Sequence, residues 1–180
     1  MSNALGLVQV GPNSDVSLIQ ISSYLSKKFA VTTQIQPPLV DPSEAYDSRR
    51  NQYHSTRMLV LLERYLESAN TDRILGITTS DLFVPGMNFV FGEARCPGRV
   101  AVVSSFRLSR SYDDESNENE LTEQRIIKEA VHEIGHMLGL QHCPNINCVM
   151  HFSKALIDTD IKSDNYCSEC QEQVETVTIG

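Results

Sequence analysis

Three of the five histidines in this sequence lie within eleven residues, HEIGHMLGLQH, at 132–142. His132 and His136 are four positions apart, so on a helix both imidazoles lie on one face, where they can bind the same metal ion. Neutral imidazole is a good ligand for Zn²⁺. Glu133 follows the first histidine, so its carboxylate is turned off the ligand axis and can reach a water at the metal. We therefore expect a metal site with Glu133 as a general base.

Gly139 follows at the point where such a helix would end. Glycine readily adopts the left-handed conformation that closes a helix and turns the chain back. This turn would bring His142 round as a third ligand. Three protein ligands leave a fourth tetrahedral position open, which distinguishes a catalytic zinc site from a structural one. Imidazoles also accept Co²⁺, Ni²⁺ or Mn²⁺, so zinc is the expected metal but the spacing alone does not select it.

Four of the five cysteines come next, as the pairs Cys143 with Cys148 and Cys167 with Cys170. Two short loops that each supply two thiolates typically build a tetrahedral zinc site. We predict a structural zinc ion here that holds the polar C-terminal segment in place. One alternative is a thioredoxin-like redox pair at 167–170, which needs a strand-to-helix context that is not evident. Another is that Cys143 reaches the catalytic metal and blocks its open position.

Apolar patterns predict the elements that must position these groups. Strands are expected at 4–11, 30–36, 72–79, 88–94 and 99–108. Helices are expected near 52–69 and at about 121–139, after a first helix that carries Leu18, Ile19, Tyr24, Leu25 and Phe29. Ser14 or Asp15 is the expected N-cap of the first helix, and Cys96-Pro97-Gly98 is an expected turn. Cys96 is expected to be a core residue and not a reactive thiol. The early β-α-β units favour a mixed sheet with helices packed on it.

The chain of 180 residues is expected to form a single domain, 1–180. Its apolar fraction of 41% and charged fraction of 21% are ordinary for a globular protein. We assign the sheet and its helices to 1–110, an acidic loop to 111–120, the active-site helix and third ligand to 121–142, and the cysteine-rich segment to 143–180.

The combined pattern resembles the archaemetzincin family of the metzincin clan of zinc metalloproteases. The resemblance rests on 132–142, on Met150 and on the four clustered cysteines, and VPGMNFVFGEA at 84–94 is similar to the family's strand pair before the active-site helix. It implies a metzincin-like fold of mixed α and β structure, with a twisted mixed sheet flanked by helices and a small zinc-stabilised C-terminal segment. It assigns Met150 to the methionine turn beneath the metal. It also implies two zinc ions per chain, one catalytic and one structural.

One position departs from the pattern of some metzincins. They carry a tyrosine two residues after the turn methionine, where its hydroxyl helps to stabilise the oxyanion, whereas this chain has Phe152. His151 could take that role, although we expect it to be a bystander.

These features predict a zinc-dependent peptidase in which Glu133 takes a proton from water and passes it to the leaving amine. Peptide or protein substrates are implied by the resemblance. The alternative is a catalytically silent zinc-binding or protein-interaction module on the same scaffold. Glu133 and the open metal position favour chemistry, whereas Phe152 and the absence of a propeptide-like segment favour the silent module.

Charge and hydropathy limit the partners. The net charge of −8 argues against nucleic-acid binding, including a zinc-finger role for the cysteines. The sequence has neither a recognisable signal peptide nor an apolar stretch that could span a bilayer, so we expect a cytoplasmic protein without membrane partners. No feature fixes the oligomeric state, and a monomer is compatible with the sequence.

Overall fold

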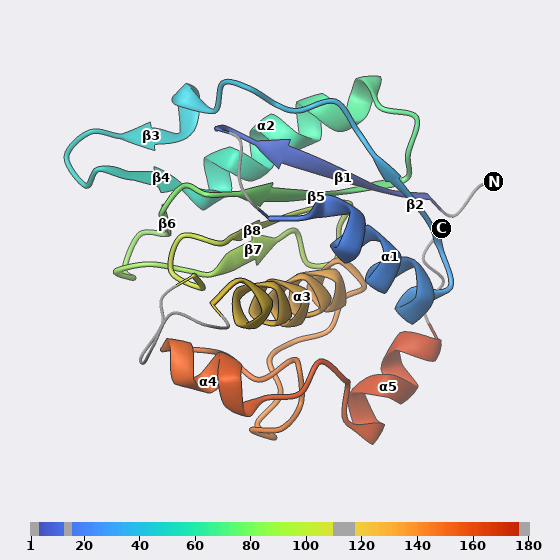
Figure 1. Ribbon diagram of the computed structural model, residues 1–180. Helices are drawn as coiled ribbons and strands as arrows, with labels where there is room; N and C mark the ends of the chain where they lie inside the picture. Colours follow the sequence, from blue (N-terminus) through green and yellow to red (C-terminus); the bar gives the residue numbers. More distant parts are fainter. Residues whose placement is uncertain (1–3, 13–15, 110–117, 177–180) are drawn as a thin grey trace.

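A five-stranded sheet forms the centre of the computed structural model, which describes residues 4–12, 16–109 and 118–176 (Figure 1). In spatial order its strands are β2 (Thr32–Ile35), β1 (Ala4–Val10), β5 (Arg73–Thr78), β8 (Val100–Ser104) and β7 (Gly92–Ala94). The first four are parallel, and β7 pairs antiparallel with β8 at the edge. The predicted mixed sheet is therefore confirmed.

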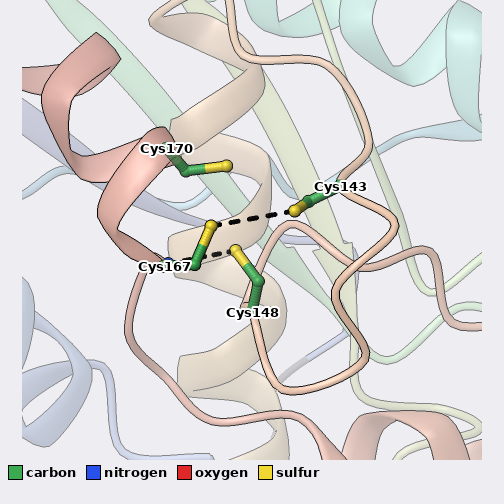
Figure 2. A group of neighbouring side chains, drawn as sticks. All are labelled: Cys143, Cys148, Cys167 and Cys170. Carbon is green, nitrogen blue, oxygen red and sulfur yellow. Dashed lines mark hydrogen bonds between the residues drawn. The ribbon is translucent and has the colours of Figure 1, made fainter.

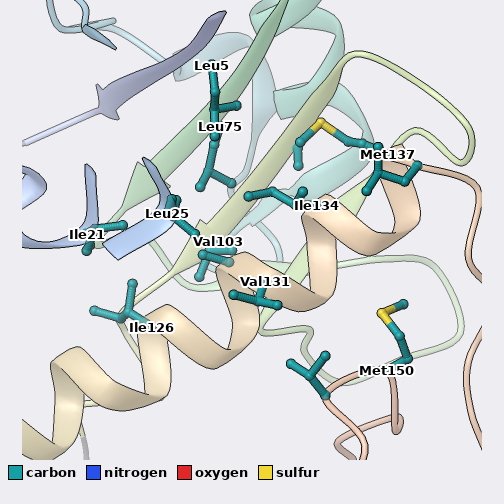
Figure 3. Close-up of a cluster of buried hydrophobic side chains, with 14 of the residues drawn as sticks. Leu5, Ile21, Leu25, Leu75, Val103, Ile126, Val131, Ile134, Met137 and Met150 are labelled. Carbon is teal, nitrogen blue, oxygen red and sulfur yellow. The ribbon is translucent and has the colours of Figure 1, made fainter. Parts of the chain in front are cut away.

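Helices cover both faces of this sheet (Figure 1). The helix α2 (Ser55–Ser68) packs on one face, and α1 (Leu18–Phe29) and α3 (Glu118–Met137) pack on the other. In Figure 3, Ile126 and Ile134 of α3 turn toward the sheet side chains Leu75 and Val103. The larger apolar cluster, to which these side chains belong, holds α3 against the sheet.

No helix within the described segments is both long and apolar enough to cross a membrane.

The helix starts differ from the sequence predictions in two places. Ser17 is the N-cap of α1, and its side chain accepts a hydrogen bond from the Gln20 N–H, so the prediction of Ser14 or Asp15 was wrong. A cap must directly precede the first helical residue, which is Leu18. The helix α3 begins at Glu118, so 118–120 belong to it and not to the predicted acidic loop. The remaining loop residues, 111–117, lie outside the described residues.

A second, smaller sheet lies beside α2 and was not predicted (Figure 1). It consists of β3 (Tyr46–Asp47), β4 (Gln52–His54) and β6 (Leu82–Phe83), and β3 follows a short 3-10 helix at Ser43–Ala45. The residues 52–54 were expected to begin the second helix, but they pair with β6 instead. Strands of two or three residues are too short to show a period of two.

The region before α3 is less regular than predicted. Only Gly92–Ala94 of the expected strand at 88–94 is a strand, and Val90 makes an isolated bridge to Leu82. The turn at Cys96-Pro97-Gly98 is present and contains a cis peptide bond before the proline. Cys96 is exposed, so its prediction as a core residue was wrong.

The chain after α3 forms two short helices, α4 (Leu156–Ile161) and α5 (Ser168–Glu175), which lie beyond α3 from the sheet (Figure 1). Ion pairs join α4 and the residue after it to α3: Arg125 to Asp160 at 2.6 Å, and Lys162 to Glu129 at 2.9 Å. This C-terminal segment therefore forms an additional layer against α3.

Candidate active site

The last turns of α3 carry His132, Glu133 and His136, and the helix then closes at a glycine. Gly139 has a φ of +98°, and its N–H donates to the carbonyl of His136 at 2.8 Å. This left-handed turn sends the chain back so that His142 faces the other two histidines. The three rings offer ligand nitrogen atoms that lie within 4.8 Å of one another. We call His132, His136 and His142 the histidine site.

The hydrogen bonds of the two helical histidines fix which nitrogen of each ring is free. His132 Nδ1 lies 2.7 Å from the carbonyl oxygen of Val149, and His136 Nδ1 lies 2.7 Å from that of Leu140. A carbonyl oxygen only accepts, so each Nδ1 carries the proton and each neutral ring has its lone pair on Nε2. These two Nε2 atoms are 3.1 Å apart. Two lone pairs cannot bond to each other, so this spacing fits a shared cation.

Burial keeps these rings neutral, as metal ligands must be. It lowers the pKa of His132 well below its usual range, and the charge of Lys162 adds to the effect. Burial likewise lowers the pKa of His136, and partial desolvation, followed by the neighbouring His136, lowers the pKa of the more exposed His142. The donor set and its protonation therefore fit a zinc ion with a fourth position open.

Glu133 lies buried beside this site, and its Oε2 has no hydrogen-bond partner among the described residues. Burial, and next the carboxylate of Glu129, raise the pKa of Glu133 well above its usual range. The edge strand β7 approaches the carboxylate closely at Gly92. A Cβ at this position would lie 2.6 Å from Glu133 Oε1 and 2.7 Å from the carbonyl oxygen of Val102. Only glycine fits here, so Gly92 helps to define where the carboxylate can lie.

A cavity of about 360 Å³ opens over the histidine site and Glu133. Residues before and within β7, including Phe89 and Phe91, line one wall, and Phe152 with its neighbours Ser153 and Lys154 lines the other. The Phe152 ring packs against His142, with centroids 4.8 Å apart. His151 is not among the cavity-lining residues, and its Nδ1 bonds to the carbonyl of Cys143 at 3.0 Å. This contact supports the expectation that His151 is a bystander.

The side chains of the four clustered cysteines point toward one another at the start of α5 (Figure 2). Their sulfur atoms lie within 4.8 Å of one another, and Cys143 Sγ is 3.8 Å from Cys167 Sγ. Bonds of about 2.3 Å from a tetrahedral zinc ion place its sulfur ligands about 3.8 Å apart. The set Cys143, Cys148, Cys167 and Cys170 therefore has the donors and spacing of a metal site, and we call it the cysteine cluster.

The surroundings of the cysteine cluster disfavour both alternatives to a structural metal site. Cys143 Sγ lies with the other sulfurs rather than with the histidine nitrogens. The segment that precedes α5 in the described chain is not a strand, so the context of a thioredoxin-like pair is missing. A hydrogen bond from the Cys170 N–H lowers the pKa of Cys167, which favours its thiolate, whereas burial raises the pKa of Cys143. A metal ion would compensate for that burial.

Met150, which the resemblance assigns to the methionine turn, lies beside α3 (Figure 3). Its backbone carbonyl accepts a hydrogen bond from the Cys143 N–H at 2.9 Å. A Cβ on Gly135 would overlap the Met150 sulfur, so the glycine between the two helical histidines makes room for this side chain. Sequence analysis missed Gly135 and Gly92. A glycine inside a helix or strand is nevertheless a signal of close approach.

The pair Glu129 and Lys162 was also missed. The Lys162 side chain is 0% exposed and that of Glu129 is 4% exposed. Thr159 donates a further hydrogen bond to Glu129 at 2.8 Å. Glu129 lines the cavity one helical turn before Glu133. No local pattern in the sequence links two residues so far apart in the chain.

Comparison with known proteins identifies the family. A sequence model described as "Peptidase family M54" matches residues 20–176. The archaemetzincin of Methanopyrus kandleri is 46% identical over 134 residues, which are 74% of this chain and 72% of that protein. Its crystal structure has a TM-score of 0.81 at 37% identity, covering 97% of this chain and 95% of that one. A zinc-dependent peptidase from Methanocorpusculum labreanum has a TM-score of 0.80 at 30% identity, covering 94% and 99%.

These similarities confirm two predictions from the sequence: the resemblance to archaemetzincins and the metzincin-like class of mixed α and β fold. They also confirm that the protein is a hydrolase that uses zinc. The chain belongs to peptidase family M54, the archaemetzincins, and is a zinc metallopeptidase.

Proposed function

We propose that the chain hydrolyses peptide bonds with Glu133 as general base and the histidine site as ligand of the catalytic zinc ion. One observation carries this proposal. The Nε2 atoms of His132 and His136 face each other at 3.1 Å with no proton to share, beside a buried Glu133 oxygen that has no hydrogen-bond partner in the described part of the chain. A scaffold without catalytic function would gain nothing from an unpaired buried carboxylate, because burial without a partner is costly.

Each residue around the metal position has a separate role in the proposed reaction. A zinc ion held by the histidine site would supply Lewis-acid chemistry, making water more acidic and polarising the substrate carbonyl. Glu133 takes the proton of the attacking water and then donates it to the nitrogen of the leaving amine. The backbone carbonyls of Val149 and Leu140 hold the helical histidines in their Nδ1-protonated form, which keeps Nε2 available. Gly92 lets the edge strand close one side of the Glu133 carboxylate.

We further propose that the cysteine cluster holds a second, structural zinc ion, which makes two per chain. Four sulfur donors within 4.8 Å of one another, one pair of them 3.8 Å apart, support this proposal. A closed sulfur site leaves no position for substrate, so its role is to hold the C-terminal segment against α3. Peptide or protein substrates would enter the cavity between β7 and the wall that contains Phe152.

Glu133→Gln tests the catalytic role. We expect the variant to retain two zinc ions per chain and to lose peptide cleavage by at least about 10²-fold, because general-base catalysis contributes about 10²–10⁴-fold. Zinc content would be measured by elemental mass spectrometry, and cleavage with a diverse peptide library. Glu120→Gln is the matched control, since it makes the same change at an exposed position on α3.

The outcomes separate the two functional hypotheses. Wild-type cleavage rates in Glu133→Gln would show that this carboxylate is not the base. Two zinc ions without cleavage in either protein would favour the catalytically silent zinc-binding or protein-interaction module.

A further inference from the structure

We propose that metal binding at the cysteine cluster and at the histidine site is positively coupled, so that a metal ion in either one raises the affinity of the other. This inference rests on the proposed function, because it requires both groups to bind metal. The coupling would pass through two short backbone connections, which join His142 to Cys143 and Cys148 to Val149.

The first connection concerns the third histidine. Among the described residues, none forms a hydrogen bond to the His142 ring; its contacts are with the rings of Phe152 and the other two histidines. His142 is also exposed, unlike the buried His132. Its position therefore depends on its own backbone, which Cys143 continues directly. A metal ion that fixes Cys143 Sγ also fixes where the His142 ring can lie.

The second connection concerns the first histidine. The Val149 carbonyl that orients His132 belongs to the residue after Cys148. Cys148 Sγ in turn accepts a hydrogen bond from the Cys167 N–H at 3.3 Å, and the Val149 N–H donates to the carbonyl of Asn165 at 2.9 Å. The cysteine cluster therefore adjoins, through Cys148, the residue whose carbonyl sets the His132 tautomer.

The two connections move together. The hydrogen bond from the Cys143 N–H to the Met150 carbonyl closes the loop between them. Without a metal ion, four sulfur atoms within 4.8 Å of one another contribute only weak S–H bonds, or repel one another as thiolates. The helix α5 has 8 residues, too few to persist without tertiary anchors. Loss of metal would therefore release the loop, and with it His142 and the Val149 carbonyl.

Cobalt(II) chloride can measure the two affinities separately. Cobalt bound by the cysteine cluster gives a thiolate-to-cobalt charge-transfer band, which reports that site. When zinc already occupies the cysteine cluster, cobalt binds at the histidine site alone, and its weaker visible bands report that second affinity. We expect Cys167→Ser with Cys170→Ser to weaken cobalt binding at the histidine site by about 5- to 150-fold, the usual range of coupling between sites. Tyr24→Phe is the control, because it removes a hydrogen bond from α1 to Asp164 in the same segment and leaves every sulfur in place. We expect this variant to bind cobalt as the wild type does.

The reverse measurement is independent of whether the serine variant folds. Coupling between two sites is reciprocal, so His136→Ala should weaken metal binding at the cysteine cluster by the same factor. Competition with a chelator, followed at the charge-transfer band, gives this affinity.

Three results would overturn the inference. One is a histidine-site affinity within twofold of wild type in a folded serine variant. Another is an equal loss of cobalt affinity at the histidine site in Tyr24→Phe, which would indicate that any destabilisation of the C-terminal segment weakens binding. The third is an unchanged cysteine-cluster affinity in His136→Ala. If the wild type binds cobalt at its cysteines alone and cleaves no peptide, the proposed function fails together with the coupling. Independent affinities in a protein that cleaves peptides would remove the coupling only.

Discussion

Lys162 and Glu129 form a buried ion pair that holds the wall of the cavity to the active-site helix. The Lys162 Nζ lies 2.9 Å from Glu129 Oε1, and it also lies 3.3 Å from the carbonyl of His151. Ser153, a cavity-lining residue, is 3.4 Å from the same Glu129 oxygen. Because both side chains are almost completely buried, the stability of each charge depends on the other.

Removal of one partner should therefore be costly. We expect Lys162→Met to lower the free energy of unfolding by about 3–5 kcal/mol, because it leaves Glu129 buried without a counter-charge. Urea denaturation of the zinc-loaded protein would measure this loss. Adding Glu129→Met to Lys162→Met replaces the pair with two apolar side chains and should recover most of the stability. A double variant as unstable as the single one would show that the ion pair is not the cause.

At the scale of elements, the end of α3 decides whether the third histidine reaches the other two. Gly139 has a φ of +98°, and the Leu140 N–H donates to the carbonyl of Gly135 at 3.0 Å. This arrangement closes the helix and points the chain toward His142. The geometry is available to glycine at no steric cost, whereas a side chain with a Cβ is strained there.

Gly139→Ala tests whether this position requires a residue without a Cβ. We expect the variant to lose about 1–2 kcal/mol of unfolding free energy, the cost of a left-handed residue with a Cβ, and to bind zinc less tightly at the histidine site. Urea denaturation and competition with a chelator would measure the two effects. The end of α1 provides a control, because there an alanine, Ala30, already occupies the left-handed conformation with a φ of +52°. Ala30→Gly should leave stability unchanged or raise it, and a loss in both variants would contradict the argument.

Periodicity predicted the longer elements but missed the short ones. The buried strand β8 and the helix α3 carry enough apolar residues to show their type. The strands β3, β4 and β6 have two or three residues each, which is too few for any period. The helices α4 and α5 depend on partners that are distant in sequence, such as the Arg125 side chain on Asp160. Such elements exist because of tertiary contacts, which local sequence does not encode.

In the candidate site, too, the residues that follow a local sequence pattern were predicted and those that depend on tertiary contacts were not. Spacing alone indicated His132, His136, Glu133 and the cysteines, because an interval of four on a helix and paired cysteines are local patterns. Gly92 could not be assigned a role, since it depends on how closely β7 approaches α3. Lys162 could not be predicted either, because its partner Glu129 lies on another element. Residues that act through packing become visible only in three dimensions.

At the scale of the whole molecule, the chain has two parts that are stabilised differently. The sheet and the helices α1, α2 and α3 enclose two apolar clusters with many fully buried side chains. The segment after Cys143 contributes four buried residues to the larger cluster, of which two, Cys148 and Cys170, belong to the cysteine cluster, and ion pairs join the segment to α3. Its order should therefore depend on metal, whereas that of the sheet should not.

Metal removal should separate these two parts. After chelation, we expect backbone amides in 143–176 to lose protection from hydrogen exchange, while those of β1, β5 and β8 keep theirs, because the apolar clusters do not need metal. Exchange followed by mass spectrometry of peptides would locate the change. Cys167→Ser with Cys170→Ser should show the same exposed segment before chelation, and chelation should add little to it there. A uniform loss of amide protection across the sheet would mean that the metal ions stabilise the whole fold. Unchanged protection in 143–176 would mean that ion pairs such as Arg125 with Asp160 are sufficient to hold the segment.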